Sequence, residues 1–352
     1  MEGRPPAAPA RARAVAGLIP GTAAAVAIAA VATVLGGFFP VVGAPVFAIV
    51  MGIVVSALRP PATSLRPGLA FTGKRILQGS IVVLGLELSL RQVLSIGQSS
   101  LPVLVGTIAV VLVLAAVLGP VLKLRSDVTT LIGVGTSICG ASAIAATSAV
   151  IGAVEADVSY AIATIFAFNV VAVLVYPALG HALGLSQHAF GTWAGTAIND
   201  TSSVVAASSV YGHAATSYGV TVKLTRTLAI VPICLALAAW RNRRRAGEAN
   251  HDAPAAAMPG TEIRWLGIFP LFIVGFLAAV SLNTAGAVPG GWHGALSDLA
   301  RWMITAALAA IGLSTRFADI RRAGPRPLIL GAVLWATIGV SSLLLQAATG
   351  TL

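Results

Sequence analysis

Long, nearly uncharged apolar runs follow one another through almost the whole chain. Eleven can be recognised, at residues 18–39, 43–58, 76–94, 101–122, 129–151, 158–180, 190–211, 217–240, 265–284, 299–315 and 327–347. Most are close to the length of about 20 residues that lets a helix cross a hydrocarbon core of about 30 Å. With 57% hydrophobic and only 9% charged residues, the chain has little sequence left for a soluble domain. We therefore predict an all-α polytopic membrane protein.

The basic residues lie between the apolar runs. If every run crosses the membrane and the N-terminus is cytoplasmic, 18 of the 22 Lys and Arg residues fall on the cytoplasmic side. This is the asymmetry of the positive-inside rule. It explains the net charge of +11 without a nucleic-acid surface, which would need a continuous basic stripe. We predict a multi-pass protein of the bacterial cytoplasmic (inner) membrane, with residues 1–17 as a cytoplasmic N-terminal tail.

Two polar stretches interrupt the apolar pattern. Residues 135–146 read GTSICGASAIAA, and residues 195–206 read GTAINDTSSVVA. Aligned without a gap, residues 135–150 and 195–210 are identical at seven of sixteen positions. Non-helical backbone at membrane depth is tolerated where protein or a water-filled cavity satisfies it, so paired interruptions indicate a transport site. The alternative is close helix packing through small residues, which would not explain Asn199 and Asp200.

The two interrupted segments are predicted to be either discontinuous helices that cross the membrane or re-entrant hairpins from opposite faces. A weaker sequence match pairs residues 85–101 with residues 312–328, which lie 227 positions further along the chain, and it favours an inverted repeat. We expect a single transporter domain over residues 18–352. Its expected parts are a gate-like half (18–122), a core with both motifs (128–240), a basic cytoplasmic loop (241–264), and spans that echo residues 43–122 (265–347).

Asp200 is the sharpest functional candidate. An ionisable group in the middle of a membrane span costs roughly 2.5 to 3.5 kcal/mol on insertion scales. A proton or cation site, with oxygens from Asn199, Thr201 and Ser202 around it, would account for that cost. The alternative is a helix cap or a structural partner for a buried base. Asn169, one amide within a helix, is interpreted as a packing residue.

Lys223 and Arg226 lie three residues apart on the next apolar run and share a helix face. A lysine ammonium beside an arginine guanidinium can bind an oxyanion, and the N-termini of interrupted helices would add backbone amide donors. The alternatives are neutralisation by Asp200 and snorkelling to a membrane edge. The candidate substrate- or ion-binding residues are Thr136, Ser137, Cys139, Gly140, Ser142, Asn199, Asp200, Thr201, Ser202, Ser203, Lys223 and Arg226.

The sequence argues against catalysis. The five histidines are scattered without metal-ligand spacing, and there is no phosphate-binding Walker loop or nucleophile elbow. We therefore expect no enzymatic activity, no metal site and no cofactor, apart from a coupling H⁺ or Na⁺. The expected partners are a small anion and the lipid bilayer, without nucleic acid, and a homodimer is left open.

The first motif, the segment from Trp193 to Ala207 and the sequence Val222-Lys223-Leu224-Thr225-Arg226 resemble the YeiH-type family of proposed sulfate exporters. The likeness runs over nearly the whole chain. It implies an inner-membrane transporter distantly similar to cation/proton antiporters and bile-acid sodium symporters, with inverted repeats and discontinuous helices. Many members have His where this chain has Asn199, and Gln where it has Ser203, so coupling through a histidine does not transfer.

The sequence as a whole predicts a secondary transporter that exports a small anion such as sulfate or a sulfonate, driven by a proton or sodium gradient. Two other classes remain open. One is a membrane sensor or scaffold that binds an anion without moving it, and the other is a passive anion channel.

Overall fold

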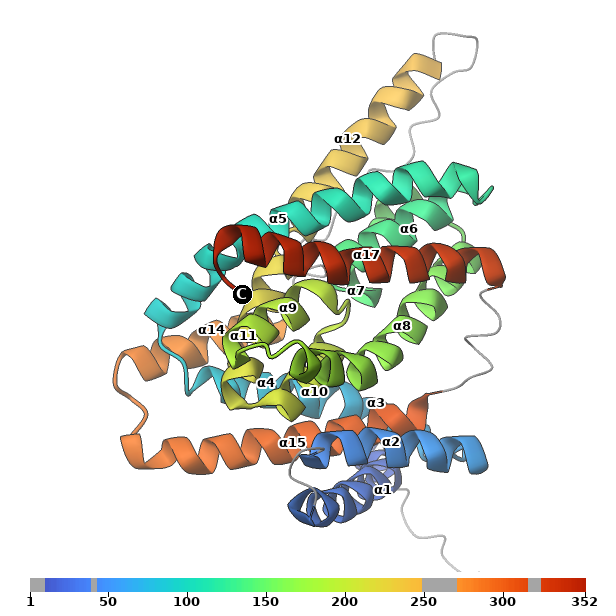
Figure 1. The fold of residues 1–352 in the computed structure, drawn as a ribbon. Helices are drawn as coiled ribbons and strands as arrows, with labels where there is room; N and C mark the ends of the chain where they lie inside the picture. The colour runs from blue at the N-terminus through green and yellow to red at the C-terminus, as the bar shows by residue number, and fades with distance from the viewer. Residues whose placement is uncertain (1–9, 39–42, 249–270, 316–323) are drawn as a thin grey trace, which may run out of the picture. The chain divides into compact units, whose positions relative to one another are not determined.

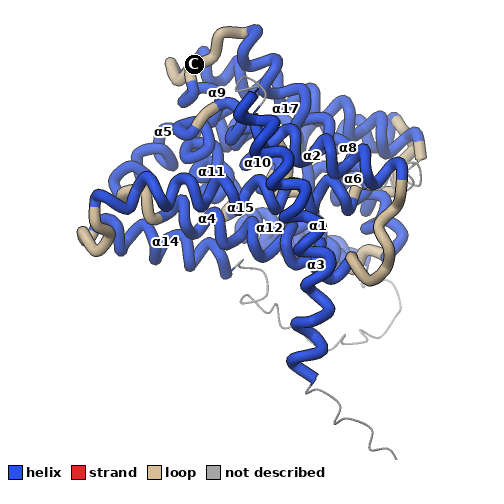
Figure 2. The backbone as a smooth tube through the Cα atoms, turned by 90° about the horizontal axis from the view of Figure 1, so that it is seen from below, coloured by secondary structure: helices blue, strands red, loops and turns tan. Residues whose placement is uncertain are grey.

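The computed structural model describes residues 10–38, 43–248, 271–315 and 324–352, with side chains omitted for 10–15 and 241–248. In these residues the regular structure is entirely helical (Figure 2). Six helical segments are long and apolar enough to cross a membrane: Ala16–Phe38, Leu90–Val121, Glu155–Ala182, His213–Trp240, Gly290–Ser314 and Pro325–Thr349. The prediction of an all-α polytopic protein is confirmed at this level. Residues 1–9 of the expected tail and 249–264 of the expected loop lie outside the described residues.

Helix α5 (Leu90–Val121) differs from the sequence prediction, which placed a link at residues 95–100. The structure ends α4 (Leu77–Gly85) earlier and runs through that stretch as one helix of 32 residues. The hydroxyls of Ser99 and Ser100 donate to the carbonyls of Ile96 and Gly97, 3.1 and 2.9 Å away. Serines that bond back to the preceding turn satisfy themselves inside a helix, so they need not mark its end.

The chain divides into two compact units, residues 1–89 with 276–317, and residues 90–275 with 318–352. Residues 90–121 belong to the unit that holds both motifs. Helix α14 (Leu271–Thr284) contains the point where the chain passes from the second unit to the first.

The first unit is built on close helix contacts at glycines. It comprises α1 (Ala10–Phe38), α2 (Gly43–Leu58), α3 (Arg66–Phe71), a π-helical turn (Thr72–Ile76), α4, a short 3₁₀ turn (Gly290–Trp292) and α15 (His293–Ser314). A Cβ added at Gly52 would lie 2.7 Å from the Ala309 carbonyl oxygen of α15. One at Gly312 would lie 2.4 Å from the Ile49 carbonyl oxygen of α2. Backbones that approach this closely leave no room for side chains between them.

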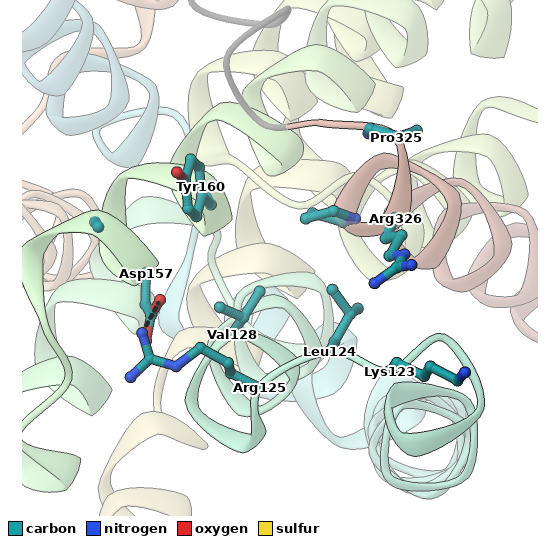
Figure 3. Close-up of a pocket in the computed structure, with 10 residues that line it drawn as sticks. Lys123, Leu124, Arg125, Val128, Asp157, Tyr160, Pro325 and Arg326 are labelled. Carbon is teal, nitrogen blue, oxygen red and sulfur yellow. Dashed lines mark hydrogen bonds and ion pairs between the residues drawn. The ribbon is translucent and has the colours of Figure 1, made fainter.

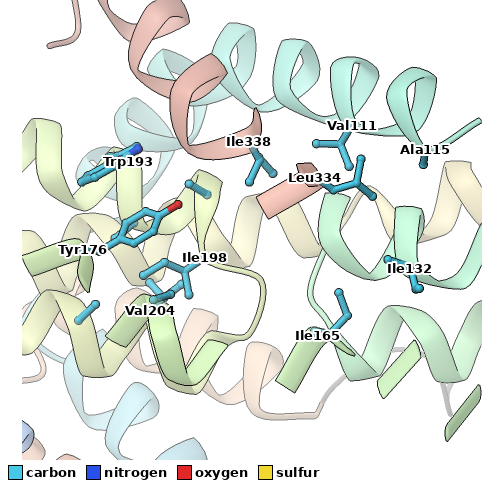
Figure 4. Packing of buried hydrophobic residues seen from close by; sticks show 14 of the residues in the cluster. Val111, Ala115, Ile132, Ile165, Tyr176, Trp193, Ile198, Val204, Leu334 and Ile338 are labelled. Carbon is cyan, nitrogen blue, oxygen red and sulfur yellow. The ribbon is translucent and has the colours of Figure 1, made fainter. Parts of the chain in front are cut away.

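The second unit contains α5, α6 (Ser126–Ser137), α7 (Ala141–Ile151), α8 (Glu155–Ala182), α9 (Gln187–Ala197), α10 (Thr201–Tyr211), α11 (His213–Thr227), α12 (Ile230–Glu248) and α17 (Pro325–Thr349). Figure 1 shows α5 and α17 lying alongside each other. Between the helices lies a continuous apolar core that includes Ile132, Ile165 and Leu334 (Figure 4). The rings of Tyr176 and Trp193 stack within it with centroids 4.3 Å apart.

Helix α9 is fastened to α17 by buried polar groups. The Trp193 indole N–H donates to the Gly339 carbonyl at 2.9 Å. The hydroxyls of Thr196 and Ser342 lie 2.5 Å apart, and the Gln346 amide donates to Ser342 at 3.3 Å. Hydrogen bonds of this kind between membrane helices are worth about 0.6 to 2 kcal/mol each. They hold α9, which carries the first part of the second motif, against a long helix.

Gly52→Ala is expected to destabilise the first unit by about 1 to 3 kcal/mol, because the new methyl group must push α2 away from α15. The measurement is thermal unfolding of the purified protein in detergent. Gly17→Ala is the matched control, since nothing lies within 4 Å of a Cβ at that position. Equal melting temperatures for both variants would contradict the close contact between α2 and α15.

Candidate functional site

Both motifs form interrupted helices. Helices α6 and α7 are separated by residues 138–140, and α9 and α10 by residues 198–200. Gly140 has φ +69° and ψ −128°, a conformation that is favourable only for glycine. A Cβ at Gly140 would lie 3.7 Å from the carbonyl carbon and oxygen of Asn199. The two interruptions, residues 138–140 and 198–200, therefore meet within the second unit. We call their meeting point the crossing.

One lysine bonds to both interruptions. The Lys223 ammonium, on α11, donates to the Ile138 carbonyl at 2.7 Å and to the Ile198 carbonyl at 2.8 Å. These carbonyls belong to the C-terminal ends of α6 and α9, where each helix dipole places roughly half a negative charge. A single positive charge thus offsets both ends at once. The Lys223 side chain is fully buried, so it does not snorkel to a membrane edge.

Arg226 reinforces the end of α6. Its Nε donates to the Ser137 carbonyl and its Nη2 to the Thr136 carbonyl, both at 2.7 Å. Arg226 is 1% exposed, so snorkelling is excluded for it as well. The predicted shared helix face is present, because both bases of α11 reach the same crossing. Both bases have main-chain acceptors, and among the described residues no ion pair joins either of them to Asp200.

Asp200 caps the N-terminus of α10. Its carboxylate accepts hydrogen bonds from the backbone N–H of Ser202, at 3.0 Å, and from the Ser202 hydroxyl. The backbone N–H of Asp200 donates to the Asn169 side-chain oxygen of α8 at 3.2 Å. A carboxylate here satisfies the orphan amides of the first turn and faces the positive end of the helix dipole. Asp200 is therefore a helix cap, which is one of the alternatives that the sequence left open. A capping carboxylate can also bind a proton or a cation, so the predicted ion site stays a prediction.

Asn169 lies at the site, although the sequence pattern predicted only a packing residue. It is 5% exposed, and it fixes the backbone of the second interruption through Asp200. The signal available was an amide inside an apolar span, which is expensive in a membrane unless it has a partner. Nothing in the sequence identified that partner, 31 residues further along the chain.

Several buried polar atoms at the crossing lack hydrogen-bond partners. They are Thr136 Oγ1, Asn199 Oδ1 and Nδ2, and Arg226 Nη1. The residues that carry them are each about 1% exposed. Native proteins pair nearly all buried polar atoms, because an unpaired one costs roughly 1 to 3 kcal/mol. Four such atoms, on the last turn of α6, on the second interruption and on the arginine that binds the end of α6, call for a ligand or bound water.

The accessible side of the crossing holds helix N-termini. Ser142 of α7 is exposed, and Asp200, Thr201 and Ser202 of α10 are partly exposed. The carbonyl ends of α6 and α9, with their two bases, are buried. The N-cap residue of α7 is Gly140, which has no side chain to cap the first turn. Free amides and a positive dipole end make such a terminus favourable for an anion.

The remaining predicted residues lie close to this crossing in different surroundings. Ser137 is fully buried and donates to the Val134 carbonyl at 3.2 Å. Cys139 and Ser203 are also buried, at 4% and 9% exposure. No group of three or more His, Cys, Asp or Glu side chains that could hold a metal occurs within the described ranges.

Two cavities lie away from the crossing. One, of about 480 Å³, is lined by the link between α5 and α6 and by the beginnings of α6, α8 and α17. The other, of about 380 Å³, lies between α5, α6 and α12 and is lined by residues that include Leu112, Gly133 and Trp240. Neither includes a residue of the two interruptions or the bases Lys223 and Arg226.

Membrane-length apolar helices and interrupted helices held by buried charge define a multi-pass membrane protein. Comparison with known proteins agrees. A family model described as "Conserved hypothetical protein 698" matches residues 20–331. No solved structure gives a significant match.

The curated relatives are UPF0324 membrane proteins. SAG1125 of Streptococcus agalactiae serotype V is 41% identical over 340 residues, which cover 95% of this chain and 98% of the relative. A UPF0324 membrane protein of Streptococcus pneumoniae serotype 4 is 41% identical over 323 residues, covering 90% and 93%. The chain therefore belongs to the UPF0324 membrane protein family. These names state a membrane location and no substrate, so the resemblance to sulfate exporters stays a prediction.

Lys223→Met is expected to destabilise the protein by about 2 to 4 kcal/mol, because two buried helix-end carbonyls lose their donor. The cost of placing a side chain in the membrane would by itself predict that Lys223→Met stabilises the protein, since methionine enters a bilayer far more readily than lysine. The measurement is thermal unfolding in detergent, with Lys74→Met, at an exposed position of the first unit, as the control. A Lys223→Met protein that melts at or above the wild-type temperature would show that the two hydrogen bonds are dispensable.

Proposed function

We propose that this protein is a secondary transporter that moves a small anion, such as sulfate or a sulfonate, across the bacterial inner membrane with a proton or sodium gradient. The observation that carries the proposal is the set of buried, unpartnered polar atoms at the meeting point of two interrupted helices. Interruptions of this kind at membrane depth are where secondary transporters bind their substrates. A ligand at the crossing would supply the missing hydrogen bonds of Thr136, Asn199 and Arg226.

The arrangement of helix ends favours an anion as that ligand. The two negative ends, of α6 and α9, are already compensated by Lys223 and Arg226. The N-cap residue of α7, Gly140, offers no side-chain cap, and Ser142 in the first turn is exposed. Uncompensated positive charge therefore lies on the accessible side. In this proposal the amides of α7 and the unpaired atoms of Thr136, Asn199 and Arg226 hold the anion, and Lys223 acts mainly by positioning the crossing.

Asp200 is the proposed coupling residue. Its carboxylate is the negative charge at the neighbouring N-terminus, that of α10, and it repels a second anion there. A proton or a sodium ion on the carboxylate removes that repulsion, so cation and anion favour each other's binding and move together. A carrier of this type is reversible. It exports whenever the outward gradient of the anion exceeds the inward gradient of the coupling ion.

The architecture that accompanies this proposal is an inverted repeat of about eleven membrane segments with a cytoplasmic N-terminus. The two interruptions occupy equivalent places in aligned motifs, which supports related halves. Alternating access would then move one part of the protein around a fixed site. The proposed assembly state is a homodimer, which cross-linking of the protein in membranes would test.

Reconstitution into liposomes tests the proposal. Labelled sulfate, sulfite, sulfonates and carboxylates are offered under imposed proton or sodium gradients. For coupling to one proton, a gradient of one pH unit, acidic on the side of the labelled anion, is expected to raise its accumulation about tenfold. Asp200→Asn is expected to abolish that increase while preserving folding, because asparagine is also a good N-cap.

Asp298→Asn serves as the matched control, because Asp298 is an exposed carboxylate paired with Arg301 on the surface of α15. It is expected to transport like the wild type. Gradient-driven accumulation in Asp200→Asn equal to that of wild type would refute the coupling role. Conductive, non-saturable flux would indicate a passive channel, and saturable binding without any flux would indicate a sensor or scaffold.

A further inference from the structure

A basic cavity lies at one end of the second unit, where four helices begin or end. It has a volume of about 480 Å³, within the usual range for ligand pockets of about 300 to 1,000 Å³. Three basic side chains line it, Lys123 and Arg125 from the link between α5 and α6, and Arg326 from the first turn of α17. Figure 3 shows Arg125 on one side of the cavity and Lys123 and Arg326 on the other, with Val128 and Leu124 between them.

The charges in this cavity do not balance. Arg125 is paired with Asp157 of α8, Nη1 to Oδ1, at 3.1 Å. Within the described part of the chain, no carboxylate pairs with Lys123 or Arg326. Three positive charges and one negative charge leave the lining with a surplus of two. That surplus suits a ligand with negative charge.

The backbone around the cavity leaves recognition to side chains. Helix α17 begins with Pro325-Arg326-Pro327, and the two prolines have no N–H to donate. Lys123 has φ +54°, in the left-handed region that is uncommon for a residue with a side chain. Such outliers persist where the surrounding structure imposes them, often at ligand sites. Here the turn places Lys123 in the wall of the cavity.

Apolar surface leads away from the same cavity along two neighbouring helices. On α5, Val113, Val117 and Val121 are exposed at a spacing of four residues, by 64%, 57% and 69%. On α17, Ile329 and Val333 are exposed on one face just after Arg326. Both helices are membrane-length, so these stripes are available to hydrocarbon chains. A basic cavity at the end of such stripes has the layout of a lipid site.

We propose that this cavity binds the phosphate-bearing headgroup of an anionic phospholipid, with Lys123 and Arg326 contacting the phosphate and the acyl chains lying along α5 and α17. Arg125 is held back by Asp157 and contributes mainly to the shape of the wall. The proposal is independent of the transport function, because the cavity includes no residue of the two helix interruptions.

The test is binding of phosphatidylglycerol to the full-length protein in detergent, followed by native mass spectrometry and thermal shift. Phosphatidylcholine, whose headgroup is zwitterionic and carries no net charge, is the control. Wild type is expected to retain phosphatidylglycerol preferentially and to melt at a higher temperature with it. Replacing both Lys123 and Arg326 by Ala is expected to weaken that binding about tenfold or more, since each basic group near a lipid phosphate contributes substantially. Arg301→Ala, at an exposed arginine of the other unit, is expected to bind like wild type.

Arg326→Lys tests whether the positive charge is what binds the lipid. It preserves that charge at an exposed position, so it is expected to keep most of the binding. Equal retention of the two lipids by wild type, or unchanged binding in the double variant, would overturn the proposal. Inorganic phosphate is the third arm. If it displaces the lipid at equal concentration, or alone gives the same stabilisation, the cavity is a site for free phosphate and the lipid assignment is wrong.

Discussion

The contact between the Lys223 ammonium and two main-chain carbonyls is the interaction on which the rest of the second unit depends. A helix interrupted inside a membrane has unpaired carbonyls at one end and unpaired amides at the other, with no bulk water to satisfy either. Lys223 joins the Ile138 and Ile198 carbonyls through one buried nitrogen. The negative C-terminal ends of α6 and α9 in turn partly compensate the charge of the Lys223 ammonium, which would be costly to bury alone. The charge and the interruptions therefore stabilise each other.

Much of this arrangement could be predicted from the sequence, for reasons that are local. Gly140 and the polar residues around Asp200 disfavour a continuous helix, so the interruptions were placed correctly. The spacing of Lys223 and Arg226 predicted a common face, because residues three apart share one on any α-helix. What could not be predicted is where that face points. The carbonyl partners of the two bases lie 25 to 90 residues away, at separations in the chain that local pattern does not reach. For the same reason the sequence does not reveal the role of Asn169, whose partner is 31 residues away. Ser99 and Ser100 differ from expectation for a local reason, because serines are typical of links and yet can bond to the preceding turn inside a helix, as they do in α5.

The two interruptions have the same length and differ in backbone conformation and in charge. Gly140 has no side chain to cap α7, whereas Asp200 caps α10 with a carboxylate. One N-terminus at the crossing is therefore neutral, that of α7, and the other is acidic, that of α10. This difference is what would allow one half of the site to hold an anion while the other half senses a cation. The first motif has no residue that could repeat the role of Asp200.

The bonds between α9 and α17 have a consequence for how the protein is made. Trp193 and Thr196 find their partners 146 residues later in the chain, at Gly339 and Ser342. During synthesis, therefore, α9 enters the membrane long before its partners exist. Until then the Trp193 indole N–H must bond to water, a chaperone or temporary neighbours, whereas the Thr196 hydroxyl can donate to the Thr192 carbonyl of its own helix. Assembly of the second motif is then one of the last steps of folding, and a nascent chain that stops before α17 carries an unfinished site.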